Sequence, residues 1–241
     1  MSGDNRNSRT GANRRGAAAV AAARKTQTRN RYVWLGTGLA VLVALVVVIA
    51  VVVVNRSGQQ QTAGAGVPIV VPATPITTAT GRSSVPPWPV PADVADSVHQ
   101  AGLPMLGAEG TAEHIHVHLD ILVDGRAVTV PALVGIDEAG QQISPLHTHD
   151  TSGVIHIESP KPSTFSLGQF FTEWQVALSA DHIGGLAAGG GEQLRAYVNG
   201  KQVSGDPAAI TFTAHDEIAL VYGSPTAKVT VPSGYNWPQG L

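Results

Sequence analysis

A run of 23 residues without a charged side chain, Tyr32 to Val54, constrains this chain more than any other feature. At about 1.5 Å per helical residue, the run is long enough to cross a hydrocarbon core about 30 Å thick. The apolar part of a cleaved signal peptide is shorter, about 7–15 residues. The sequence therefore predicts one transmembrane helix over residues 32–54.

Charges on either side of this run predict its orientation. Eight of the 15 Lys and Arg residues precede it in residues 1–31, against one acidic residue, Asp4, and only Arg56 follows closely. Because positively charged flanks stay in the cytoplasm, we expect a cytoplasmic N-terminus and an extracytoplasmic segment 55–241. Residues 1–31 contain almost no large apolar side chains, which predicts a disordered basic tail.

The extracytoplasmic segment is acidic and contains no cysteine. Sixteen of the 17 Asp and Glu residues follow the apolar run, so this segment lacks the basic surface that nucleic-acid binding requires. Without cysteine it forms no disulfide and no thiolate metal site. Metal ligands would have to come from His, Asp or Glu.

Composition divides this segment into three parts. Residues 55–92 are rich in Gly, Gln, Thr, Ser and Pro, which is typical of an extended linker. Residues 93–234 carry the periodic apolar patterns of a folded domain, and residues 235–241 read as a C-terminal tail.

The segment EHIHVHLDILV, residues 113–123, predicts a strand with one apolar and one polar face, because its residue types alternate. The apolar face holds Ile115, Val117, Leu119, Ile121 and Val123, and the polar face holds His114, His116, His118 and Asp120. The following Asp124-Gly125 favours a two-residue hairpin turn. Such a turn would pair Val123 with Arg126, Ile121 with Val128 and Leu119 with Val130.

Later segments complete an α+β pattern. GVIHIES predicts a second strand, and STFSLGQFFTEWQVAL predicts a helix that starts with a Ser166–Gln169 capping box. Its apolar stripe is Leu167, Phe170, Phe171, Trp174 and Leu178. Asn199-Gly200 predicts another hairpin, ITFTAHDEIALVYG ends in a buried strand, and AKVTVP suggests a last one. We expect a small antiparallel or mixed sheet packed on one main helix, compatible with a β-grasp-like arrangement.

Six of the nine histidines lie in two dense clusters, which predicts a metal site. Imidazole is the commonest protein ligand for zinc and copper, and alternate strand residues present their side chains on one face. The candidate ligands are His114, His116, His118, His147, His149 and His156. Asp120, Asp150 and Glu158 are candidate ligands or acceptors that orient an imidazole. His215 is ambiguous, and we expect His99 and His182 on the surface.

A simpler alternative is that these histidines only form the solvated face of an antiparallel sheet. Known catalytic patterns fit poorly. HVHLD is similar to the first strand of amidohydrolases, but that barrel needs about 250 residues, and about 120 remain after His118. A cupin would place Glu close behind the His pair, where this chain has Asp120. The sequence contains no Gly-x-Ser-x-Gly, phosphate loop or cysteine nucleophile. It predicts no catalytic residue.

The motifs EHIHVHLDILVDG, LHTHDTSGVIHIESP, FSLGQFFTEW and HDEIALVYG resemble an uncharacterised family of single-pass bacterial envelope proteins of high-GC Gram-positive type. The resemblance covers about residues 110–223. It implies one domain there and a location in the cell envelope, and it implies no mechanism.

We therefore expect a membrane-anchored extracytoplasmic domain that binds copper or zinc as a binder, buffer or sensor. One alternative is a metal-dependent hydrolase with Asp150 or Glu158 as general base. Another is a cell-envelope protein-interaction module whose histidines respond to acid pH.

Overall fold

The computed structural model describes residues 70–241. The predicted cytoplasmic tail, the apolar run Tyr32–Val54 and the first part of the predicted linker lie outside these residues. Within the described range, no helix combines the length and the apolar character that crossing a membrane requires.

Residues 70–241 form two short α-helices, one 3-10 helix and eleven strands. The helices are α2 (Val94–Gln100), α3 (Leu167–Glu173) and the 3-10 helix η1 (Pro207–Ala209). The strands are β1 (Glu113–Val123), β2 (Arg126–Val128), β3 (Ile136–Asp137), β4 (Gln142–Ile143), β5 (Leu146–His147), β6 (Val154–Ser159), β7 (His182–Ile183), β8 (Leu186–Ala187), β9 (Gln193–Val198), β10 (Lys201–Val203) and β11 (Glu217–Gly223).

Seven strands form one mixed sheet in the order β10-β9-β11-β1-β6-β5, with β2 also paired to β1. The long strand β1 is central. It runs parallel to β11 along one edge and antiparallel to β6 and β2 along the other. Parallel neighbours need a long crossover connection, and here that connection includes α3. The predicted α+β class is confirmed for this part of the chain.

Both predicted hairpin turns are present. Asp124 and Gly125 have φ angles of 50° and 74°, and Asn199 and Gly200 have 52° and 73°, as a type I′ turn requires. The pairs Val123–Arg126 and Ile121–Val128 form as predicted. The third predicted pair, Leu119 with Val130, does not form. Strand β2 ends at Val128, and the Leu119 amide donates to the Gly153 carbonyl instead, at 2.9 Å.

Helix α3 starts with the predicted capping box, in which the Ser166 and Gln169 side chains each accept a backbone N–H of the other residue. The helix is shorter than predicted and ends at Glu173. Gln175 takes a left-handed φ of 58°, while the amides of Gln175 and Val176 donate to the carbonyls of Thr172 and Phe171. This is a Schellman ending. Because Gln rather than Gly occupies the left-handed position, the residue pattern did not predict it.

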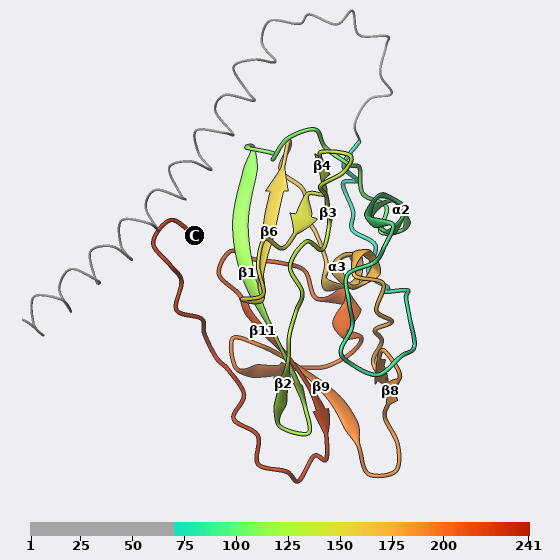
Figure 1. The fold of residues 1–241 in the computed structure, drawn as a ribbon. Coiled ribbons are helices and arrows are strands. Elements are labelled where there is room, and N and C mark those ends of the chain that lie inside the picture. Colours follow the sequence, from blue (N-terminus) through green and yellow to red (C-terminus); the bar gives the residue numbers. More distant parts are fainter. Residues whose placement is uncertain (1–69) are drawn as a thin grey trace, which may run out of the picture. The chain divides into compact units, whose positions relative to one another are not determined.

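The core lies between α3 and one face of the sheet. All five residues of the predicted apolar stripe are buried, although Leu178 contributes from the extended chain after the helix. They pack with buried sheet residues, among them Val117, Leu119, Ile121, Ile155 and Ile157. In Figure 1, α2 and α3 lie on one side of β1 and β6, and the chain after β11 returns along the other side. The predicted core and polar faces of β1 are therefore correctly assigned.

Segments on both sides of the predicted domain 93–234 also pack into it. Val71 and Trp88 are buried, and the Trp88 ring meets Trp174 edge-on at 5.8 Å. At the other end, the Tyr235 ring stacks on His118. The described residues after Gly223 form no further strand, so AKVTVP is not the strand that its pattern suggested.

One carboxyl group, Glu173, is completely buried at the end of α3. The Ser144 hydroxyl donates to its Oε1 atom, and Oε2 has no hydrogen-bond partner among residues 70–241. Burial disfavours the carboxylate and raises the pKa of Glu173 well above its ordinary value of 4.5. The folded protein therefore holds this group protonated at pH values where the unfolded chain ionises it.

We expect Glu173→Gln to make the protein less sensitive to rising pH. A folded pKa above the unfolded one gives stability that is present below about pH 4.5 and declines as pH rises toward the folded pKa, by up to about 1.4 kcal/mol per pH unit. Glutamine cannot ionise, so the free energy of unfolding of the variant should rise relative to that of the wild type between pH 5 and 8. Chemical unfolding with chelator present, followed by tryptophan fluorescence, measures this difference. Equal pH slopes for the two proteins would contradict it.

Candidate metal centre

Three neighbouring strands bring histidines directly opposite one another. His116 of β1 pairs with His156 of β6, and His156 pairs with His147 of β5. Directly opposed residues in an antiparallel ladder have Cβ atoms about 5 Å apart. The ring centroids of His116 and His147 accordingly lie 4.5 and 5.3 Å from that of His156. The pairing register alone therefore assembles a row of three imidazoles.

A glutamate joins this row one step along the strands. His114 of β1 pairs with Glu158 of β6, which places both side chains on the histidine face. Glu158 Oε1 lies 3.3 Å from His114 Nε2 and 3.3 Å from His156 Nδ1. Its other oxygen, Oε2, is buried without a hydrogen-bond partner in the described part of the chain.

His149 completes the cluster from the loop after β5. Its Nε2 lies 3.2 Å from His147 Nε2, and its ring centroid is 4.5 Å from that of His156. The His149 side chain is 45% exposed, and Glu109 lies beside it with Oε1 at 4.0 Å. Five of the six predicted ligand histidines therefore form one continuous cluster with Glu158.

Two overlapping groups in this cluster have the composition and spacing to hold a metal ion. We call His114, His116, His156 and Glu158 the first ligand set, and His147, His149, His156 and Glu158 the second ligand set. Within each set, the candidate ligand atoms all lie within 4.8 Å of one another. His156 and Glu158 belong to both sets.

The two buried imidazoles of the cluster that carry the largest pKa shifts, His116 and His147, are uncharged near neutral pH. Burial, with a contribution from His156, lowers the pKa of His116 to about 4, and burial lowers the pKa of His147 to about 3. Burial also lowers the pKa of His149. A neutral imidazole keeps a free lone pair on one nitrogen, and this neutral form is the one that binds a metal.

A hydrogen bond sets the tautomer of one of these ligands, and a second ligand atom has no hydrogen-bond partner among the described residues. His147 Nδ1 lies 3.0 Å from the Ser144 carbonyl, which can only accept, so Nδ1 carries the proton and Nε2 carries the lone pair. His116 Nε2 is buried and has no hydrogen-bond partner within residues 70–241. Buried polar atoms nearly always have a hydrogen-bond partner, so this nitrogen is a candidate ligand atom for a metal ion.

Glu158 keeps its negative charge in the cluster. Burial acts to raise its pKa, but the hydrogen bond with His156 and the nearby His147 and His114 outweigh burial and lower it. The cluster therefore combines one carboxylate with the neutral imidazoles of His116 and His147.

His118 lies apart from both ligand sets. Its Nδ1 is 2.8 Å from Glu217 Oε2 and its Nε2 is 2.8 Å from the Ser152 carbonyl, so both ring nitrogens face oxygen acceptors. Burial acts against protonation, but Glu217 and the Ser152 carbonyl outweigh it and raise the pKa of His118. Gly153, with φ 92°, permits this approach, because a Cβ there would lie 2.9 Å from His118 Nε2.

Together, His118, Asp120 and Glu217 form a third group whose candidate ligand atoms lie within 4.8 Å of one another. Asp120 Oδ2 lies 3.7 Å from His118 Nδ1. Glu217 was not among the predicted residues. Its only sequence signal was its place beside His215 in AHDEI, at the start of the predicted last buried strand.

The other singled-out residues have different surroundings. Asp150 Oδ1 accepts the Ser152 amide at 2.8 Å, and these hydrogen bonds with Ser152 lower the pKa of Asp150. His215 has a left-handed φ of 65°; its amide donates to the His116 carbonyl, and its ring stacks on Trp237 at 4.7 Å. His99 is exposed on α2.

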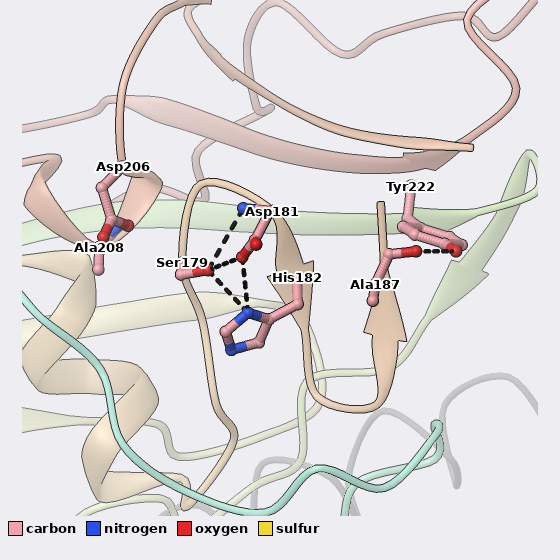
Figure 2. A network of polar contacts seen from close by, with 7 residues as sticks. All are labelled: Ser179, Asp181, His182, Ala187, Asp206, Ala208 and Tyr222. Carbon is pink, nitrogen blue, oxygen red and sulfur yellow. Dashed lines mark hydrogen bonds and ion pairs between the residues drawn. The ribbon is translucent and has the colours of Figure 1, made fainter. Parts of the chain in front are cut away.

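His182 belongs to a polar turn, shown in Figure 2, that contains Ser179 and Asp181. These residue types occur in hydrolytic triads, but there Ser and Asp contact opposite ring nitrogens. Here Ser179 Oγ and Asp181 Oδ1 both contact His182 Nδ1, at 2.7 and 2.9 Å. The contacts fix the turn and do not form a proton relay.

A cavity of about 410 Å³ adjoins the first ligand set. It is lined by His114, Ile115, His116, Ala214, His215, Gly240 and Leu241. The predicted C-terminal tail thus contributes to the surroundings of the centre. Tyr235 and Trp237, the two aromatic residues of this tail, were the sequence signal for its packing.

Comparisons with protein-family models, curated proteins and solved structures found no match to this chain.

Two histidines on the same face of β1 should respond oppositely to substitution by leucine in chelator-treated protein. His116→Leu removes an unpartnered buried nitrogen, so we expect unchanged stability or a gain of up to about 1–3 kcal/mol. His118→Leu leaves the Glu217 carboxyl buried without its partner, and we expect a loss of about 3 kcal/mol. Urea unfolding at pH 7 measures both. Equal losses for the two variants would contradict the division between them.

Proposed function

We propose that this protein is a membrane-anchored extracytoplasmic metal binder, acting as a buffer or sensor of copper or zinc. The observation that carries the proposal is the pair of unpartnered buried atoms, His116 Nε2 and Glu158 Oε2, within a cluster of five imidazoles. A bound cation would supply the partner that both atoms lack among the described residues.

The donor set favours copper or zinc. Five imidazoles and one carboxylate are the nitrogen-rich ligands that suit zinc and copper. Calcium and magnesium prefer sets made of oxygen ligands. We leave His118 outside the ligand set, because both of its nitrogens already have oxygen partners.

A metal-dependent hydrolase is the second candidate, and the cavity beside His114 and His116 favours it. The two residues predicted as general base argue for binding instead. Glu158 belongs to both ligand sets, and Asp150 is held in a turn by Ser152. We therefore prefer the binder.

An envelope protein-interaction module that responds to acid pH has less support. Such a response needs imidazoles that take up protons near pH 6–7. The pKa values of His116 and His147, about 4 and 3, lie well below that range. A cell-envelope protein partner of the metal-bound form stays compatible with the proposal.

The location and the finer fold class are also proposals. Flanking charges around Tyr32–Val54 support a single-pass anchor with a cytoplasmic N-terminus. The β-grasp-like comparison is supported by the parallel central pair β1 and β11, flanked by the antiparallel strands β6 and β9, with α3 in the crossover.

The full chain, made without a polyhistidine tag and purified in mild detergent, should bind Zn(II) or Cu(II) more tightly than about 1 μM. The double variant His156→Ala/Glu158→Ala should lose this binding, because it removes the two residues that both ligand sets share. His99→Ala/His182→Ala is the matched control and should bind like the wild type. Mass-spectrometric metal analysis and calorimetric titration measure the outcome. No binding tighter than micromolar, or equal loss in both double variants, would contradict the proposal.

The anchor has a separate test. In intact cells, externally added protease should cleave residues 70–241 and spare a tag fused to the N-terminus, because the positively charged flank stays inside. Immunoblotting against both ends measures this. Protection of both ends, or loss of the N-terminal tag, would contradict the predicted orientation.

A further inference from the structure

The cluster contains more ligand atoms than one tetrahedral ion can use. Zinc in structural sites takes four ligands, whereas the two ligand sets together supply five imidazoles and one carboxylate. These six ligand residues are arranged in two groups around a shared centre. His114 and His116 lie on one side of the shared residues His156 and Glu158, and His147 and His149 lie on the other.

Each end of the cluster has a donor pair at metal-ligand spacing. Ligand atoms about 2.05 Å from a tetrahedral ion lie about 3.3 Å from each other. In the first set, His114 Nε2 and Glu158 Oε1 are 3.3 Å apart; in the second, His147 Nε2 and His149 Nε2 are 3.2 Å apart. The two pairs share no atom, so each can serve its own ion.

The Glu158 carboxylate, which belongs to both ligand sets, has one oxygen without a hydrogen-bond partner among the described residues. Glu158 Oε1 faces His114 and His156, while Oε2 is buried and has no partner within residues 70–241. A carboxylate can bind one ion through each oxygen, and paired ions about 3.5–4 Å apart are common in metalloenzymes. Further negative charge near the second set comes from Glu109 and Asp150, which both act on the His149 ring.

Each ligand set also combines a buried and an exposed imidazole. His116 and His147 are buried, whereas the side chains of His114 and His149 are 53% and 45% exposed. An ion can therefore enter each set from solvent through its own exposed histidine. One carboxylate with two divalent ions leaves the centre cationic, which favours an added hydroxide or other small anion.

We propose that the centre holds two transition-metal ions per chain, bridged by the Glu158 carboxylate, with His114 and His116 on one ion and His147 and His149 on the other. This inference rests on the proposed metal-binding function. It adds a second ion and a bridging role for Glu158. His156, which belongs to both sets, is a ligand for one ion or the other.

Stoichiometry tests the proposal on the tag-free full chain with Zn(II) as the probe. The wild type should bind two equivalents, and His149→Ala and His114→Ala should each bind one. Both substitutions are at exposed side chains, so the fold should tolerate them. His99→Ala is the control and should bind two. X-ray absorption of the loaded wild type should show a metal neighbour at about 3.5–4 Å.

Glu158→Gln tests the bridge itself. An amide has one oxygen acceptor and cannot join two ions as a carboxylate does, so the second equivalent should bind at least about tenfold more weakly. Retention of two tight equivalents in Glu158→Gln would overturn the bridge.

The outcomes separate this inference from the proposed function. One equivalent in the wild type, with affinity lowered in both single variants, would overturn the two-ion centre and keep metal binding. Two equivalents in both His149→Ala and His114→Ala would place the second ion elsewhere and overturn the inference. No Zn(II) or Cu(II) binding by the wild type would overturn the proposed function together with it.

Discussion

The pairing register of β1, β6 and β5 links the hydrophobic core to the histidine cluster. Side chains alternate across a sheet, so the pairing that sets His116 against His156 also turns Ile155 and Ile157 toward α3. A slip of one residue in β6 would bury His156 in the core and expose isoleucines on the other face. Burial of the apolar face therefore selects the register, and the register assembles the histidine cluster.

The histidine face of β1 combines two opposite electrostatic environments two residues apart. His116 is surrounded by other imidazoles and is uncharged, whereas His118 lies between the Glu217 carboxylate and the Ser152 carbonyl, which favour its protonated form. A metal ion can replace the missing partner of the first and would compete with a proton on the second. The same residue type is thus an unpartnered candidate ligand at one position and a hydrogen-bonded structural residue two positions later.

Several segments outside the histidine motifs shape the centre. The chain after β11 crosses the histidine face, with Tyr235 on His118 and Trp237 on His215. On the opposite face, the capped helix α3 and the buried Trp88 support the sheet from behind. A rigid sheet holds His116, His147 and His156, while His149 comes from a loop and is partly exposed. Rigid candidate ligands beside the partly exposed His114 and His149 suit a site that takes up ions from solvent.

Local patterns in the chain were enough to predict the faces of β1, both hairpin turns, the start of α3 and the residue types of the candidate metal centre, because these depend on periodicity and turn chemistry. Long-range packing places His118 outside the cluster, against Glu217, 99 residues away, and places Glu158 between two ligand sets. It also decided where α3 ends and that residues near 71 and 235 join the domain. Partners distant in the chain meet only through strand pairing and packing, and no local pattern records that pairing.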